Sequence, residues 1–140
     1  MTTNLDRLAA KHAQSIITNT QSQKASDIEN TVTKTLGVLQ ENGVYACFLY
    51  LLAKEKENGK VVVSEILNLL QDLNFGWNKP HDLSPDAVLK HITNNVTQNL
   101  ERLLLTKETL EQMLIYARYG AKARQVAEKS TNSQQQEETP

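Results

Sequence analysis

The segment Val44-Tyr45-Ala46-Cys47-Phe48-Leu49-Tyr50-Leu51-Leu52-Ala53 contains no charged side chain and no amide side chain over ten consecutive residues. Ten residues are too few to span a bilayer, which takes roughly 20 apolar residues. The segment follows Gly43 and leads into the charged sequence 54–57, so it predicts a buried helix, apolar on all sides, whose last turn reaches water. We expect the other segments to pack around this central helix.

The composition favours a single all-α domain. The core must consist mainly of aliphatic side chains, because 39% of the 140 residues are hydrophobic and only 5% are aromatic. Five glycines and three prolines are few for the many turns of an all-β fold. We therefore predict a compact bundle of about six helices in residues 1–129. The segment 130–140 contains no apolar residue and is expected to be disordered.

Capping residues predict the ends of the first three helices. Asn4 is a candidate N-cap for the first helix. Ser26 and Glu29 have the spacing of a capping box, which predicts that the second helix begins there. Asn-Gly pairs at 42–43 and 58–59 are expected to close the second and third helices, because glycine adopts the left-handed conformation at the least steric cost.

Three further helices are expected in the second half of the chain. The valines at 61–63 alone would suggest a strand, but the helical periodicity of residues 64–73 and the lack of a second strand predict a helix. Ser84 followed by proline marks the start of a fifth helix, which we expect to continue to about Leu105. Thr106 is a candidate N-cap for the last helix.

Two distinctive side chains are interpreted as parts of the core. Cys47 is the only cysteine, cannot form an internal disulfide and lies in the apolar segment, which indicates a buried thiol. Trp77 is the only tryptophan and lies in a predicted loop at 74–82. A large ring in that position is more often an anchor that fixes the loop to the core than a binding residue.

The sequence lacks the patterns of a catalytic, metal or membrane protein. The three histidines share no ligand spacing with the cysteine or with a carboxylate, and the glycines form no phosphate loop. We therefore expect no cofactor, no metal and no enzyme activity. The N-terminus has no apolar signal region, so we expect a cytoplasmic protein without a membrane partner. A helix-turn-helix DNA reader is rejected because its recognition helix would be the apolar segment 44–53, which cannot hydrogen-bond base edges.

The last predicted helix carries the strongest polar feature. Between residues 118 and 129, four bases oppose one acid and give a local charge of +3; these residues are Arg118, Lys122, Arg124, Lys129 and Glu128. Arg118 and Lys122 are one turn apart and share a face, with Tyr119 and Gly120 between them, an arrangement suited to a phosphodiester strand. Alternatively, these cations complement the negative C-terminal end of the helix. Gly120 permits close approach of another helix or of a backbone.

Two other basic groups are weaker. Arg7 and Lys11 lie one turn apart on the first helix and either contact RNA or form a solvated face. In the sequence 54–60, three lysines alternate with two glutamates, so we expect their fields largely to cancel.

Three segments together resemble one protein family. They are LDRLAAKHA at 5–13, TLGVLQENGVYACFLYLLAK at 35–54 and LLLTKETLEQMLIYARYGAKA at 103–123. They are similar to the small helical subunit of type III-B CRISPR effector (Cmr) complexes, and the resemblance covers most of residues 5–124. The helix that ends in Asn-Gly, followed by an apolar helix that ends in Ala-Lys, is its most specific part.

The resemblance implies an all-helical, non-catalytic antiviral-defence protein whose copies stack along the interior of a ribonucleoprotein complex. Its implied partners are the other effector subunits, further copies of the chain, and the backbones of the guide RNA and target RNA. Carried onto this sequence, Arg118 and Lys122 match basic positions of the family's last helix, and Arg7 and Lys11 match those of the first. Arg124 is a further candidate contact. The alternative hypothesis is a helical adaptor or inhibitor that docks in a protein groove and has no RNA role.

Overall fold

The structure is a computed structural model that describes residues 4–54 and 56–137, with side chains described as far as Thr131. Over these residues the chain forms six α-helices, one short 3-10 helix and no strand, which confirms the predicted all-α class. In chain order they are α1 (Leu5–Asn19), α2 (Ala25–Asn42), α3 (Val44–Lys54), α4 (Glu57–Asp72), α5 (Pro85–Asn94), η1 (Val96–Gln98) and α6 (Leu100–Glu137).

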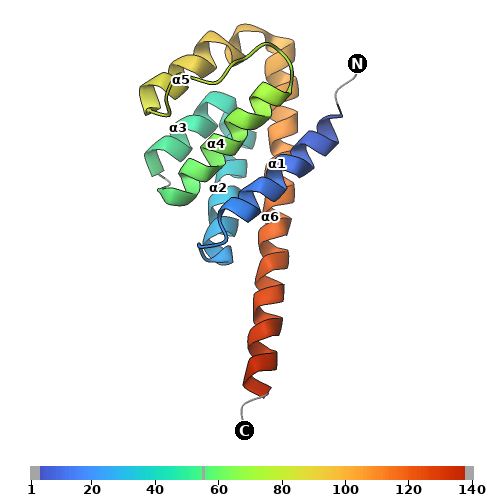
Figure 1. Cartoon of the computed structure of the whole chain (residues 1–140). Coiled ribbons are helices and arrows are strands. Elements are labelled where there is room, and N and C mark those ends of the chain that lie inside the picture. The colour runs from blue at the N-terminus through green and yellow to red at the C-terminus, as the bar shows by residue number, and fades with distance from the viewer. Residues whose placement is uncertain (1–3, 55, 138–140) are drawn as a thin grey trace.

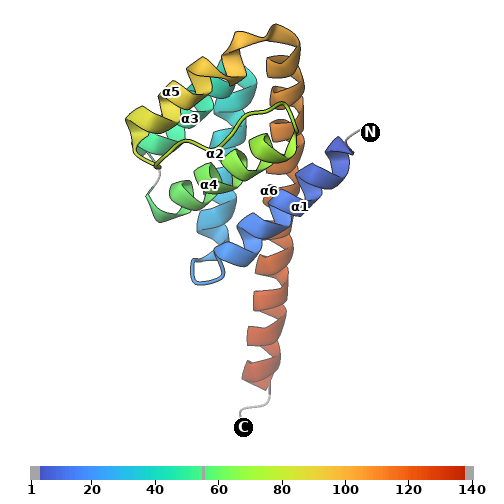
Figure 2. The same ribbon diagram turned by 45° about the horizontal axis from the view of Figure 1, so that its top comes forward.

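The long helix α6 organises the bundle. Its most extensive contacts are with α1 and α2, and Figure 1 shows α1 crossing it obliquely. α3 packs on α2, α4 packs on α1 and α3, and α5 covers the far end next to α3 (Figure 2). The stripe that α6 buries is the one that its apolar periodicity predicts, and it consists of Leu110, Met113, Leu114, Ala117 and Ala121.

The apolar helix α3 is packed against three neighbouring helices but, contrary to the expectation from the sequence, is not covered on all sides. Cys47 and Phe48 are fully buried, but Tyr45 and Leu49 on the other face are 38% and 42% exposed. The physical reason is its place in the fold, because α3 lies at the side of the bundle against α2, α4 and α5, and contacts α6 only slightly. The helix that contacts its neighbours most extensively is α6.

Three of the predicted helix ends are confirmed. Asn4 caps α1, since its Oδ1 accepts a hydrogen bond from the backbone N–H of Arg7 at 3.0 Å. Gly43 ends α2 with a φ of +94°, which glycine adopts without steric cost. Ser84 caps α5, because its Oγ accepts from the N–H of Ala87 at 3.3 Å.

The capping box predicted for α2 is wrong. The helix begins one residue earlier at Ala25, and its N-cap Lys24 makes no side-chain capping bond. Ala25 is buried, so core packing draws this residue into the first turn. The Glu29 carboxylate, which the capping box would have turned back to the helix start, instead accepts from Nε2 of Gln125 at 2.6 Å.

The second Asn-Gly pair does not end α3. That helix ends at Lys54, and residues 58–59 belong to the first turn of α4, which begins at Glu57. Gly59 is buried and, with Leu51 and Leu52 of α3, lines one small hollow, so it lies at the contact between the two helices. The valines at 61–63 are helical, as predicted.

The predicted continuation of α5 to Leu105 is also wrong. α5 ends at Asn94, the 3-10 helix follows, and α6 begins at Leu100 with Asn99 as its cap, whose Oδ1 accepts from the N–H of Arg102 at 3.0 Å. Thr106 is therefore an internal residue of α6, fully buried, and its Oγ1 has no hydrogen-bond partner in the described part of the chain. Asparagine and threonine both favour N-caps, so the sequence alone did not separate these candidates.

The loop between α4 and α5 is fixed to the core as predicted. Trp77 is 6% exposed, and its ring meets that of Phe75 edge-on at 5.0 Å between centroids. The guanidinium of Arg102 lies 4.9 Å from the centroid of the Phe75 ring and donates to the Phe75 carbonyl at 3.3 Å. These contacts attach the loop to the first turn of α6.

The last turns of α6 extend beyond the rest of the bundle (Figure 1). Its backbone is helical to Glu137. Of the segment 130–140, which the sequence predicts to be disordered, the side chains after Thr131 and residues 138–140 lie outside the described part. None of the helices, over the residues that the structure describes, has both the length and the apolar character needed to cross a bilayer.

Candidate nucleic-acid interface

Arg118, Lys122 and Lys129 lie along one stripe of α6, because spacings of 4 and 7 residues return to nearly the same face of a helix. We call these three residues the α6 cation row. Lys122 and Lys129 are exposed, and Arg118 is half-buried with an Nε that has no partner among the described residues. Nζ of Lys122 lies 3.7 Å from Oε1 of Glu29, so the row follows the side of α6 that borders α2.

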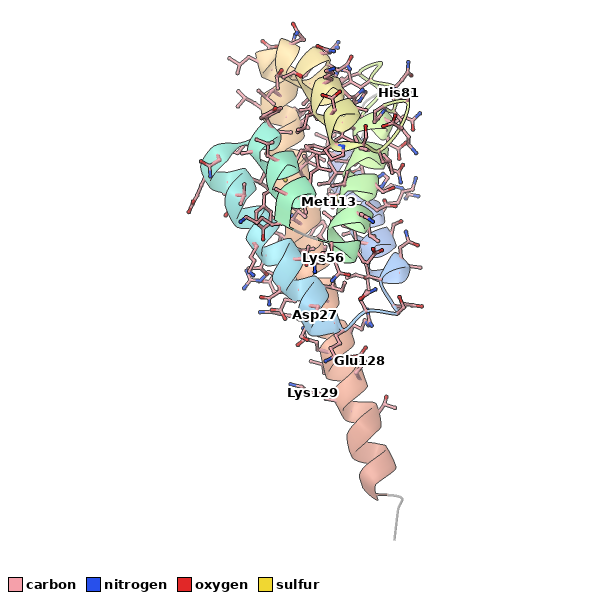
Figure 3. The ribbon with its side chains drawn as sticks, turned by 90° about the vertical axis from the view of Figure 1, so that its left-hand side faces the viewer. Asp27, Lys56, His81, Met113, Glu128 and Lys129 are labelled. Atoms are coloured by element: carbon pink, nitrogen blue, oxygen red, sulfur yellow. The ribbon has the colours of Figure 1, made fainter. Side chains whose placement is uncertain are left out.

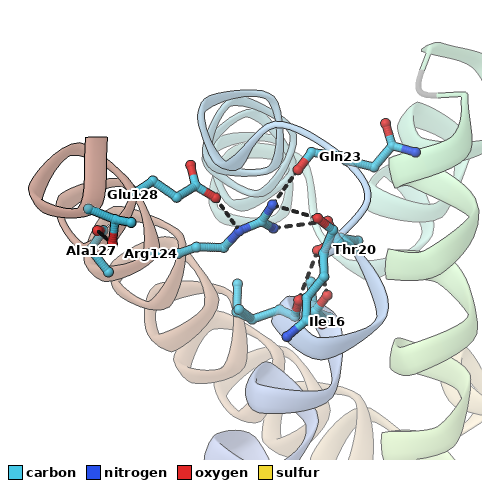
Figure 4. A network of polar contacts seen from close by, with 9 residues as sticks. Ile16, Thr20, Gln23, Arg124, Ala127 and Glu128 are labelled. Carbon is cyan, nitrogen blue, oxygen red and sulfur yellow. Dashed lines mark hydrogen bonds and ion pairs between the residues drawn. The ribbon is translucent and has the colours of Figure 1, made fainter. Parts of the chain in front are cut away.

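Arg124 does not belong to this row, although the sequence grouped it with the row. Its guanidinium donates to the backbone carbonyls of Thr20 and Gln21 at 2.9 Å each and to that of Gln23, and its Nε lies 2.9 Å from Oε1 of Glu128 (Figure 4). Only 17% of its side chain is exposed. Arg124 therefore joins the loop between α1 and α2 to α6, and its guanidinium hydrogen-bonds to acceptors of the protein itself.

The two basic groups predicted from the sequence do not form one patch. Lys11 on α1 lies 3.6 Å from Oδ2 of Asp72 on α4, whereas Lys122 pairs with Glu29 on α2. Arg7 is exposed one turn before Lys11 and has no carboxylate within 4.0 Å among the described residues. The α1 cations are thus a separate, smaller group.

A buried polar cluster that the sequence did not reveal joins α1 to α4. His12 is 4% exposed, with Nδ1 2.8 Å from Oε2 of Glu65 and Nε2 2.8 Å from Oδ2 of Asp72. Each ring nitrogen thus lies within hydrogen-bonding distance of one carboxyl oxygen, so two acidic side chains of α4 hold the ring of His12 in place. Asn68 completes the cluster by donating to Oε1 of Glu65 at 3.1 Å.

The His12 cluster escaped prediction because its members are 53 and 60 residues apart in sequence. One signal was present. Glu65 and Asp72 are separated by seven residues within a strongly apolar helix, so both lie on nearly the same face as buried leucines. Within the described part of the chain, no group of three or more histidine, cysteine or acidic side chains has the arrangement of a metal site.

An open groove of about 530 Å³ runs between α1 and α6 beside Gly120. A Cβ added to Gly120 would lie 3.0 Å from Cγ1 of Ile17, so the glycine permits the close approach of these two helices, one of the two roles expected for it. At the edge of the groove, the Tyr116 hydroxyl donates to the Asp6 carboxylate, and this hydrogen bond raises the pKa of Tyr116. Tyr119 is 62% exposed on the outer side of α6.

The remaining candidate for chemistry, Cys47, is buried as predicted. Desolvation raises the pKa of its thiol to about 12. The thiol therefore stays protonated at neutral pH, and protonated thiols are poor nucleophiles.

The chain was compared with protein-family models, with curated proteins and with solved structures, and none of them matches it. Function is therefore inferred from the residues themselves.

Proposed function

We propose that this chain is a non-catalytic small subunit of a type III-B CRISPR effector complex, which stacks along the interior of the complex and contacts the backbones of guide RNA and target RNA. The three segments that resemble this family support the assignment. The structural observation that carries it is the α6 cation row, which aligns Arg118, Lys122 and Lys129 on one helix edge.

The geometry of the row suits contacts with phosphates. Eleven residues separate Arg118 from Lys129, about 16 Å along the helix axis at 1.5 Å per residue, so the three cations can meet more than one phosphate. Such contacts position a nucleic acid without reading its sequence. The pair between Lys122 and Glu29 is partly exposed, and exposed ion pairs contribute little, so Lys122 can exchange this partner for a phosphate.

The exposed aromatic ring of Tyr119 adds a second kind of contact. It lies next to Arg118 and is 62% exposed, so an unpaired base can stack on it. Because the formal charge of the whole chain is −1, we expect a single copy to bind free RNA weakly. Stacked copies would align their rows and raise the affinity through multivalency.

The test is a double substitution, Arg118→Gln with Lys122→Gln, in the assembled complex. Glutamine removes the charge without the repulsion from Glu29 that a glutamate at 122 would add. We expect unchanged assembly, weaker retention of target RNA and a salt slope reduced by about 1 for each lost phosphate contact. The matched control is Lys79→Gln with Lys90→Gln, which changes the net charge equally. A wild-type salt slope in the first variant would contradict the assigned contact.

One observation favours the second candidate, a helical protein-interaction module. The outer side of α6 carries three large apolar side chains, Leu104, Tyr119 and Val126, which are 57%, 62% and 67% exposed. Apolar residues on one helix face are typical of helices that dock in a partner's groove. This alternative predicts partner binding that is insensitive to ionic strength and no RNA in the protein purified from its native host.

A further inference from the structure

A polar hollow of about 410 Å³ lies where α2 meets the junction between α3 and α4. Three lysines line it from three different segments. Lys34 comes from α2, Lys54 is the last residue of α3, and Lys56 immediately precedes α4. Figure 3 faces this side of the molecule and labels Lys56 and Asp27. The fold therefore brings Lys34 beside the lysines of residues 54–60, whose charges were expected largely to be cancelled by the neighbouring glutamates.

These lysines differ from many others in the chain because no carboxylate of the described residues lies within 4.0 Å of them. By contrast, Lys11, Lys60, Lys90, Lys107 and Lys122 each form such a pair. The hollow contains two acids, which do not neutralise its lysines by contact. Glu57 lies 3.5 Å from Lys60, and Asp27 is in the first turn of α2, where a carboxylate complements the helix dipole.

Three such lysines favour an anion that can accept from several ammonium groups at once. Lysine ammoniums are compact point charges with three donors each, and they are common phosphate ligands. The first turn of α4 borders the same hollow and has no side-chain cap, so its N–H groups add partial positive charge there. This contribution supports the lysines and does not define the site alone.

We propose that the hollow lined by Lys34, Lys54 and Lys56 binds a phosphate group, either of a nucleic-acid backbone or of a free phosphate compound. The proposal does not depend on the α6 cation row or on membership of a CRISPR complex. It adds a second group of lysine side chains, from α2 and from the α3–α4 junction, that holds phosphate.

The first experiment measures binding of the whole chain to a labelled single-stranded RNA 20-mer by fluorescence anisotropy between 25 and 200 mM salt. We compare Lys34→Gln with Lys54→Gln against the control pair Lys79→Gln with Lys90→Gln, which has the same net charge. Lys56 is left intact because it is the N-cap of α4. We expect the hollow pair to weaken binding about tenfold at low salt and to reduce the salt slope by about 1.4, since each single-strand phosphate contact contributes about 0.7.

The second experiment distinguishes the two phosphate sources. Amide signals of Lys54 and Lys56 are followed by NMR during titration with tripolyphosphate and, separately, with the RNA. Shifts with both ligands show that free phosphate compounds enter the hollow, whereas shifts with RNA alone assign it to a nucleic-acid backbone. In the double variant Lys34→Gln with Lys54→Gln, the amide signals of residues 54 and 56 should not shift with either ligand. Thermal unfolding checks that this variant is folded.

Several results would overturn this site. They are equal losses in the hollow pair and the control pair, unshifted amides with both ligands, or binding of polyglutamate as tight as that of RNA. The outcome is separable from the proposed function. If Arg118→Gln with Lys122→Gln lowers RNA binding and the hollow pair does not, the α6 row stands and the hollow is refuted. The reverse result supports the hollow, and the α6 row is then decided by the experiment in the assembled complex.

Discussion

Two polar junctions hold α1 and the loop that follows it, and they use opposite chemistry. At the first, His12 lies buried between two carboxylates of α4. At the second, Arg124 of α6 donates to three carbonyl groups of the loop after α1. The first depends on polar side chains removed from water, and leaving one of them without its partner is costly. The second depends on neutral carbonyl acceptors at the edge of solvent. A side chain's identity alone thus does not fix its role.

The comparison predicts the largest loss of stability for His12→Ala. Removing the imidazole ring leaves the Glu65 carboxyl group buried without its hydrogen-bond partner, and breaking buried pairs costs about 3–5 kcal/mol. We expect the lower end, about 3 kcal/mol in urea unfolding, because the Asp72 side chain is 38% exposed and water can solvate it. The control is His81→Ala, whose side chain is 85% exposed beside Asp82 and should cost less than about 0.5 kcal/mol. Equal effects of the two substitutions would refute the cluster.

A smaller loss is expected at the second junction from Arg124→Met. Methionine retains much of the apolar stem but cannot donate to the carbonyls of Thr20, Gln21 and Gln23. We expect a destabilisation of about 2 kcal/mol, since hydrogen bonds to charged groups contribute about 1.5–3 kcal/mol and water replaces part of what is lost. The stability of Arg124→Lys should fall between that of the unchanged protein and that of Arg124→Met, because a lysine ammonium can donate hydrogen bonds but lacks the planar fork of the guanidinium.

Lys129→Met is the control for that measurement, because it removes a cation from the same helix at an exposed position. We expect a change within about 0.5 kcal/mol, as for most surface substitutions. A loss of stability in Lys129→Met equal to that in Arg124→Met would show that the charge of the helix end, and not the loop contact, is the source of the effect.

These junctions also show where reasoning from sequence succeeded and where it could not. The helices α4 and α6, which contain Val62 and Leu110, were predictable because the spacing of apolar residues is local information. The end of α2 at Gly43 was predictable because it depends on the conformational preference of that one residue. The partners of His12 and Arg124 were not predictable, because they lie tens of residues away, and those of Arg124 are backbone carbonyls that every residue has. The same limit applies to Lys34, which only the fold brings beside Lys54.

A matched pair of glycines tests the close contact of α1 with α6. In a helix, Gly→Ala gains up to about 1 kcal/mol from backbone preference alone. Gly37 of α2 has no atom within 4 Å of an added Cβ, so Gly37→Ala should gain most of this amount. Gly120→Ala places its new methyl 3.0 Å from Cγ1 of Ile17, and we expect the gain to be cancelled. Thermal unfolding of both variants measures the difference, and equal gains would show that α1 yields at this contact.

A small effect is also expected from Lys122→Ala, two residues from Arg124 on the same helix. Its ammonium lies 3.7 Å from Glu29 at the surface, with 45% of the side chain exposed, and such pairs contribute about 0–1 kcal/mol. Glu29 also keeps the hydrogen bond from Gln125 at 2.6 Å, so its carboxylate is not left alone. We therefore expect a change of less than about 0.5 kcal/mol in urea unfolding. A near-zero value leaves Lys122 available for a ligand, whereas a loss near that of Arg124→Met would make it part of the scaffold and remove it from the α6 cation row.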